Sequence, residues 1–179
     1  MKEIKAKLIF QGQYIQLLMR GKWEFIRRHN CSGIVIIIAV TDDQKILFVE
    51  QHRPPLNKST IELPAGLAGD ESKHKGENLV KAAKRELLEE TGYSAKRVVP
   101  LMSGPVSGGS SADIVSLMRA FGLQKKNKGG GDGTEFIKVH EVPLAKVDAW
   151  LRRMEQKGFL IEPKIYAGLY FVNKYNENS

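Results

Sequence analysis

Three carboxylates in the segment RELLEETGY, residues 85–93, have the spacing of a ligand set. Glu86, Glu89 and Glu90 stand at positions i, i+3 and i+4, so a helix presents all of them on one face. Like charges gathered in this way repel one another unless a cation compensates them, and the pattern turns Arg85 toward another face. Mg²⁺ favours a few carboxylates together with substrate phosphate oxygens. The spacing leaves two interpretations open, a metal site or a solvated acidic patch.

The residues around these carboxylates resemble the signature of the Nudix hydrolases, G-x5-E-x7-R-E-U-x-E-E-x-G-U, where U is a bulky apolar residue. Every fixed position from Glu77 onward is present. The leading glycine corresponds to Gly66, and ten residues separate it from Glu77 where the family has five. The loop at 67–76 is therefore enlarged, while the spacing of the carboxylates is intact.

The resemblance implies a divalent cation, Mg²⁺ with Mn²⁺ as an alternative. Its ligands would be Glu86, Glu89, Glu90 and the backbone carbonyl of Ala65, with Glu89 also counted among the catalytic residues. The resemblance gives Glu77 and Arg85 a structural role, in which charge-assisted hydrogen bonds hold the loop and the helix together.

Segments outside the signature resemble the branch of the family that hydrolyses ADP-ribose and other nucleoside diphosphate sugars. The segment VEQHRPPLNKSTIELPAGL, residues 49–67, matches this branch. The match implies that Arg53 contacts the diphosphate or the terminal ribose and that Glu62 lies beside the metals. The alternative for Arg53 is a surface arginine packed on the neighbouring prolines.

Two later segments extend this resemblance. GPVSGGSSADIVSLMRAF, residues 104–121, resembles a substrate loop followed by a strand, and places Pro105 in a substrate loop that ends at Ser111. GGGDGTEFIKVHEVP, residues 129–143, resembles a loop whose glutamate acts as general base or positions the water. Glu135 is the best match and Asp132 is the alternative. An ordinary exposed loop acid is the third interpretation.

The segment WEFIRR, residues 23–28, resembles the tryptophan–glutamate segment that binds adenine in this branch. The match makes Trp23 and Glu24 substrate-binding residues. A core tryptophan that covers the sheet is the other interpretation of Trp23. The branch also implies that residues 1–30 form an N-terminal strand layer that exchanges with a second subunit. The chain would then be a homodimer in which residues 31–179 form the Nudix hydrolase domain.

Hydrophobic periodicity predicts the elements that position these residues. Apolar residues at helical spacing predict a helix from Glu77 to Thr91, ended by Gly92. Gly66 indicates a turn, and KKNKGGGDG, residues 125–133, indicates a mobile loop that cannot pack. The remaining predicted elements are strands at Ile34–Val40 and Lys45–Glu50 joined as a hairpin, strands at Lys58–Pro64, Val98–Leu101, Ile114–Phe121 and Phe136–Val142, and helices at Pro143–Met154 and Pro163–Lys174. This order is α+β. The resemblance implies a Nudix α/β/α sandwich with a mixed β-sheet, preceded by the small N-terminal β-strand layer.

Composition and charge limit the function classes. The 179 residues, 42% hydrophobic and 27% charged, are typical of an ordinary globular domain. The longest apolar run, Ile34–Val40, is far shorter than the roughly 20 residues that span a bilayer, so no membrane partner is expected. The single cysteine, Cys31, forms no internal disulfide, which favours a cytoplasmic protein. The net charge of +8 favours an anionic partner, but the scattered basic residues do not favour a nucleic acid.

The sequence therefore predicts a metal-dependent enzyme that hydrolyses the pyrophosphate bond of nucleoside diphosphate sugars. ADP-ribose is the first candidate, and the products would be a nucleoside monophosphate and a sugar phosphate. Two alternatives stay open. One is a Nudix hydrolase of free nucleotides or of RNA 5′ ends, which the positive charge allows. The other is a non-catalytic module that binds nucleotide sugars.

Overall fold

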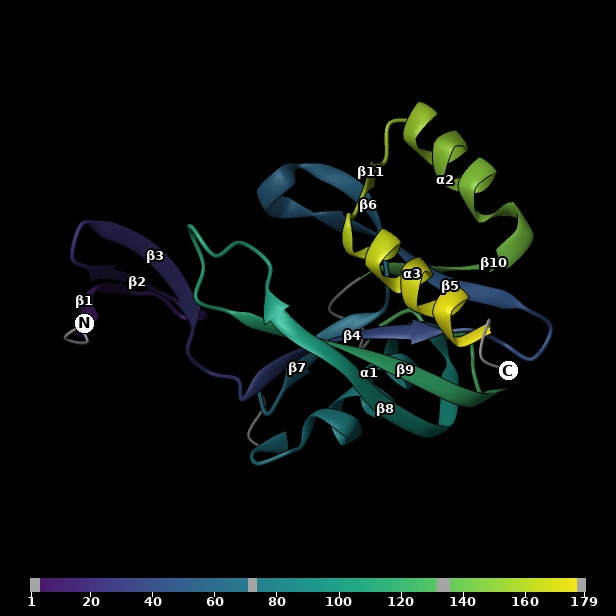
Figure 1. Cartoon of the computed structure of the whole chain (residues 1–179), viewed down its shortest axis with the longest axis horizontal. Helices are drawn as coiled ribbons and strands as arrows, with labels where there is room; N and C mark the ends of the chain where they lie inside the picture. Colours follow the sequence, from purple (N-terminus) through teal and green to yellow (C-terminus); the bar gives the residue numbers. More distant parts are fainter. Residues whose placement is uncertain (1–3, 71–73, 132–135, 177–179) are drawn as a thin grey trace.

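The computed structural model describes residues 4–70, 74–131 and 136–176, and Figure 1 shows the arrangement of its elements. In chain order the elements are β1 (Lys7–Gln11), β2 (Ile15–Arg20), β3 (Trp23–Arg28), β4 (Gly33–Ala39), β5 (Lys45–Arg53), η1 (Pro54–Leu56), β6 (Lys58–Glu62), β7 (Ala65–Ala68), α1 (Leu79–Thr91), β8 (Tyr93–Pro105), β9 (Ile114–Lys125), β10 (Ile137–Pro143), η3 (Leu144–Lys146), α2 (Val147–Gln156), β11 (Leu160–Ile161) and α3 (Lys164–Asn176).

The first three strands form a sheet of their own, in the order β1-β2-β3, at the left of Figure 1. Both strand pairs are antiparallel. The sheet is joined to the rest of the chain along β3, where Ile26 exchanges backbone hydrogen bonds with Ser110 and Ala112, both of 2.9 Å. The N-terminal strands therefore contact the segment between β8 and β9, which contains the predicted substrate loop.

The remaining strands form two four-stranded sheets, in the orders β7-β4-β9-β8 and β10-β5-β6-β11. Each sheet is mixed, because β4 pairs with β9 and β6 pairs with β11 in parallel, while the other pairs are antiparallel. The predicted α+β order with a mixed sheet is confirmed.

The predicted hairpin of the strands now labelled β4 and β5 is wrong in its pairing. A turn joins them, in which the Thr41 N–H donates to the Lys45 carbonyl, but only Val40 and Ile46 form a bridge between the strands. Beyond that point β4 and β5 enter different sheets. The physical reason is burial: both strands are apolar along nearly their whole length, so each is covered on both faces as a central strand.

Helices cover both faces of this strand layer. Val35, Ile37 and Ala39 of β4 pack in a buried cluster with the apolar side of α1. Ile36 and Ile38, on the opposite face of the same strand, pack in a second cluster with α2 and α3. The alternation along one strand therefore produces the predicted α/β/α sandwich.

The carboxylate helix begins two residues later than predicted. Asn78 caps its N-terminus by accepting a hydrogen bond from the Lys81 N–H (2.9 Å), so Glu77 precedes the helix. The predicted glycine end is confirmed, because Gly92 has φ +76° and its N–H donates to the Leu88 carbonyl. The predicted turn at Gly66 is wrong, since Gly66 lies within β7. In the part of the chain that the structure describes, no helix is long and apolar enough to cross a membrane.

Candidate functional site

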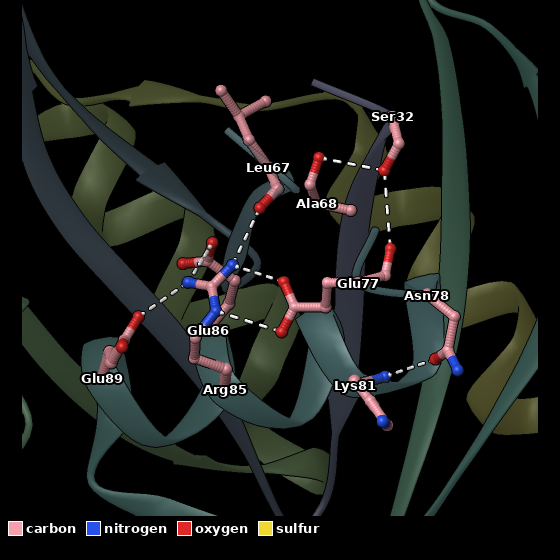
Figure 2. Close-up of polar contacts among 9 residues, drawn as sticks. All are labelled: Ser32, Leu67, Ala68, Glu77, Asn78, Lys81, Arg85, Glu86 and Glu89. Atoms are coloured by element: carbon pink, nitrogen blue, oxygen red, sulfur yellow. Dashed lines mark hydrogen bonds and ion pairs between the residues drawn. The ribbon is translucent and has the colours of Figure 1, made fainter. Parts of the chain in front are cut away.

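Arg85 of α1 lies at the centre of the contacts in Figure 2. Its Nη1 donates to Glu86 Oε1 (2.8 Å) and to Glu89 Oε2 (2.9 Å). Its Nε and Nη2 donate to the Glu77 carboxylate (3.3 and 3.1 Å), and Nη2 also donates to the Leu67 carbonyl (2.9 Å). The predicted structural pairing of Glu77 with Arg85 is confirmed. The prediction that Arg85 faces away from the carboxylates is wrong, although its i,i+4 spacing to Glu89 was a signal for their contact.

Strand β7 lies against two of the carboxylates. The N–H of Ala65 donates to Glu90 Oε2 (3.0 Å), and Glu90 is only 6% exposed. The next residue, Gly66, leaves space for Glu86: a Cβ at this position would lie 2.0 Å from the Glu86 Cδ. The fold thus brings Ala65, Glu86 and Glu90 of the predicted ligand set to one wall between α1 and β7, and Arg85 connects Glu89 to it.

The electrostatics of this wall favour a cation. Burial raises the pKa of Glu86 to about 7, since the nearby Arg85 does not fully offset the burial and the charge of Glu89 adds to the rise. Burial also disfavours the charged form of Arg85, but its hydrogen bonds to Glu77 and the charge of Glu86 outweigh it and raise the pKa of the guanidinium. A buried carboxylate with this pKa gains from any additional positive charge.

The donor atoms at the wall fit a hard divalent cation, because carboxylate and backbone oxygens are the ligands that Mg²⁺ takes. Among the described residues, no three His, Cys, Asp or Glu side chains are grouped as a ready metal cluster. The contacts explain this arrangement: Arg85 holds Glu86 and Glu89, while the Ala65 N–H holds Glu90.

The loop after β9 packs onto the end of the carboxylate helix. The N–H groups of Gly130 and Gly131 donate to the carbonyls of Glu90 (2.9 Å) and Glu89 (3.0 Å). These carbonyls belong to the last turn of α1, where the helix itself offers no partners. A Cβ on Gly129 would lie 2.4 Å from the backbone of Thr91. The prediction of a loop that cannot pack is therefore wrong for residues 126–131, because glycines allow a close backbone approach.

The two candidate general bases, Asp132 and Glu135, lie outside the described residues. The described residue before them, Gly131, donates its N–H to the Glu89 carbonyl, and the described residue after them, Phe136, is exposed.

Arg53 and Glu62 form an ion pair between β5 and β6. The Nε and Nη2 of Arg53 donate to both carboxylate oxygens of Glu62 (2.8 and 2.6 Å), and the hydroxyl of Thr60 donates to the same carboxylate. The guanidinium thus lies on Glu62, not on the prolines as in the alternative interpretation. Burial disfavours the Glu62 carboxylate, but the hydrogen bonds from Arg53 and Thr60 outweigh it and lower the pKa of Glu62.

This pair predicts a stability that depends on pH. Because the pKa of Glu62 is lowered in the folded state, the pair stabilises the fold above the ordinary carboxyl pKa and loses this effect as the pH falls through the folded value. Arg53→Met should therefore lower the free energy of unfolding by about 2 kcal/mol at pH 7, and by much less at an acidic pH below the lowered folded pKa, where Glu62 is protonated. Urea denaturation at both pH values measures this. The control is Lys58→Met, because Lys58 is an exposed cation that stands opposite Arg53 in the register of the two strands. Equal losses at both pH values would contradict the assignment.

The predicted substrate residues near the N-terminus lie on exposed positions. Trp23, the first residue of β3, is 66% exposed, so its interpretation as a core tryptophan is wrong. Glu24 follows it and is also exposed. Pro105 ends β8 opposite Ile114, next to the segment that β3 contacts.

A cavity of about 200 Å³ lies where the N-terminal sheet meets β7. It is lined by Tyr14, Arg28, Asn30, Cys31, Leu67 and Asp70. One of these residues, Leu67, also accepts a hydrogen bond from Arg85 at its backbone carbonyl. Burial raises the pKa of the Cys31 thiol and keeps it protonated. The sequence did not identify Arg28 as a cavity residue, although Arg28 belongs to the segment WEFIRR, which resembles the adenine-binding segment of the branch.

Comparisons with known proteins agree with this geometry. The model of the NUDIX domain matches residues 32–161. A methanol dehydrogenase activator of Bacillus methanolicus is 39% identical over 153 residues, covering 80% of this chain and 78% of that protein. An ADP-ribose pyrophosphatase of Bacillus subtilis (strain 168) is 37% identical over 150 residues, with 80% and 78% covered. The crystal structure of an ADP compounds hydrolase shares the fold, with a TM-score of 0.74 at 18% identity over 97% of this chain and 92% of that one.

Proposed function

This chain belongs to the NUDIX domain family, and from that premise we propose that it hydrolyses the pyrophosphate bond of nucleoside diphosphate sugars, with ADP-ribose as the first substrate. The products are a nucleoside monophosphate and a sugar phosphate. The observation that carries the proposal is the wall between α1 and β7, where Glu86 faces Gly66 and Glu90 is bound by Ala65. The name of the B. subtilis relative supports the choice of substrate.

We assign the divalent cation to Glu86, Glu89, Glu90 and the carbonyl oxygen of Ala65, with Mg²⁺ preferred and Mn²⁺ as an alternative. Such a cation offsets the charge of the pyrophosphate and of the departing phosphate. The protein holds the ligands in place beforehand, because one Arg85 nitrogen binds both Glu86 and Glu89. The raised pKa of Glu86 supports the assignment, since a cation beside it would favour the ionised carboxylate.

The remaining catalytic assignment is the group that activates or positions the water. We propose Glu135 for this role, with Asp132 as the alternative. The attachment of Gly130 and Gly131 to the last turn of α1 supports placing this role in the loop that follows, because the chain enters that loop beside the carboxylate helix.

This assignment predicts that Glu135→Gln lowers kcat by about 100-fold, in the range typical for the loss of a general base. Asp132→Asn, which removes a neighbouring charge from the same loop, should have a much smaller effect. Both rates are measured at saturating substrate and metal. The reverse order of effects would transfer the role to Asp132.

Substrate contacts are proposed along the cavity next to the N-terminal sheet. The exposed ring of Trp23 can stack on a base, with Glu24 beside it, and the loop from Pro105 to Ser111 adjoins β3. The cavity itself contributes Arg28, whose charge suits a diphosphate. Arg53 is assigned to the diphosphate or the terminal ribose, and its bidentate contact with Glu62 holds the guanidinium in a defined position.

We propose that residues 1–30 form a dimerisation layer and that residues 31–179 form the hydrolase domain. The N-terminal sheet exposes many large apolar side chains, which a second copy of the chain could cover. They are Leu8, Ile9, Phe10, Tyr14, Ile15, Trp23 and Ile26. Light scattering at assay concentration tests the proposal: a dimer that Phe10→Lys weakens supports it, and a monomer contradicts it.

The experiment that tests the proposed function is an assay with a substrate panel, with and without Mg²⁺. The panel contains ADP-ribose, other nucleoside diphosphate sugars, nucleoside triphosphates and RNA with a 5′ triphosphate, and products are separated by chromatography. AMP and ribose 5-phosphate formed only with metal would support the proposal. Turnover confined to triphosphates or RNA would overturn the substrate. A further assay adds a methanol dehydrogenase and measures whether the chain activates it, as the name of the B. methanolicus relative says of that protein.

We place the protein in the cytoplasm and expect neither a membrane nor a nucleic-acid partner.

A further inference from the structure

A second cavity, of about 240 Å³, lies between β10 and α2. In Figure 1, α2 stands at the upper right, away from the N-terminal strands at the left. The side chains of this cavity belong to residues 140–153, and none of the residues assigned above to the metal, the substrate or the water lines it. The cavity is therefore separate from the groups assigned to the reaction.

Two cations line this cavity, Lys146 directly before α2 and Arg153 within it. Lys146, Trp150 and Arg153 stand at positions i, i+4 and i+7, and all three line the cavity. The side chains of Lys146 and Arg153 are exposed, and neither makes a hydrogen bond or an ion pair among the described residues. The cavity thus carries two positive charges that no group among the described residues neutralises.

The acidic residue that lines the cavity, Glu141, and the carboxylate bound to His140, Glu50, already have partners. Glu141 accepts hydrogen bonds from the Tyr93 hydroxyl and from Lys125 Nζ, each of 2.7 Å. The carboxylate of Glu50, on β5, lies 2.7 Å from Nε2 of His140, on β10. Because these carboxylates have partners, the two cations remain available to an anionic ligand.

The wall between the two cations is a fixed aromatic ring. Trp150 stacks on the buried Phe48, with ring centroids 5.5 Å apart and planes 9° apart. His140 contacts the same ring at 5.0 Å and 58°. The indole is half-buried, so part of it faces the cavity. Cations beside a rigid aromatic surface suit a ligand that combines an anionic group with a planar ring.

We propose that this cavity binds a nucleoside monophosphate, with the phosphate between Lys146 and Arg153 and the base against Trp150. The proposed reaction releases a product of this class, so occupancy of the site would rise with product concentration. The binding itself does not depend on turnover, and a test of binding can succeed or fail independently of the proposed function.

Tryptophan fluorescence provides a local test. The chain has two tryptophans, so Trp23→Phe leaves Trp150 as the single reporter. In this background, titration with AMP should change the Trp150 emission. The added pair Lys146→Met and Arg153→Met should raise the Kd at least about tenfold. Adenosine, which has the base without the anion, should give no comparable response.

A matched control changes two cations of the same region that do not line the cavity, Arg152→Met and Lys157→Met. This pair should keep the AMP affinity of the parent. Far-UV circular dichroism and urea denaturation show that each variant is folded. An unchanged Kd in the Lys146/Arg153 pair, an equal loss in the control pair, or no Trp150 response to millimolar AMP would overturn the proposal. A Trp150 response in this background together with no ADP-ribose turnover by the wild-type chain would overturn only the proposed function.

Discussion

Glu89→Gln and Glu90→Gln are each expected to lower the turnover of ADP-ribose about a thousandfold while the chain stays folded, which corresponds to about 4 kcal/mol in the activation barrier. The amide keeps the shape of the side chain but loses the charge that a divalent cation requires. The fold should survive, because a Gln oxygen at position 90 can still accept the hydrogen bond from the Ala65 N–H. At position 89 the carboxylate is more exposed, at 37%.

Initial rates and Mg²⁺ titration by calorimetry measure both effects. Glu155→Gln is the control, since Glu155 is an exposed carboxylate on α2, outside the candidate site. Rates at the wild-type level in either helix variant would contradict the metal assignment. A loss of activity together with a loss of helical signal would indicate unfolding, so circular dichroism accompanies the assay.

Gly66→Ala is the second change with a large expected effect. The added Cβ would lie 2.0 Å from Glu86 Cδ and 2.3 and 2.4 Å from its two oxygens, so the carboxylate must move. The contacts are with the end of a flexible side chain, and φ of Gly66 is not in the left-handed region. The loss of stability should therefore be modest, about 1 kcal/mol. The displaced Glu86 leaves its contact with Arg85, and kcat should fall about 100-fold with weaker Mg²⁺ binding.

Gly104→Ala is the matched control, because a Cβ there meets only the Met102 Cε at 4.0 Å, its φ is not positive either, and it lies in β8 before the proposed substrate loop. It should leave both stability and turnover near the wild-type values. Full activity of Gly66→Ala would show that the position of the Glu86 carboxylate does not matter for the reaction. A large loss of stability would show that the wall between α1 and β7 cannot adjust.

The features that the sequence predicted correctly depend on local spacing. The positions of Glu86, Glu89 and Glu90 in one helix follow from a period of 3.6 residues, and the helix end follows from the conformational freedom of Gly92. The continuous run of β-branched residues in β4 likewise predicts a buried strand before its neighbours are known. These properties involve neighbours within a few residues, so they can be predicted before the fold is known.

Other features are decided by contacts between residues far apart in the chain. The direction of Arg85 depends on Glu77 and on the Leu67 carbonyl, which β7 brings to the helix. Strands β4 and β5 separate into two sheets because each gains more burial from other strands than from its sequence neighbour.

The same holds for the glycine loop and for the second cavity. The sequence predicts that Gly130 and Gly131 belong to an unattached loop. In the fold, their N–H groups donate to carbonyls in the last turn of α1. Lys146 and Arg153 resemble ordinary surface cations until β10 and Trp150 close a cavity around them. Composition and periodicity describe what each residue tends to do. Only tertiary packing determines which distant group each residue contacts, because the free energy of such a contact depends on both groups being held in place.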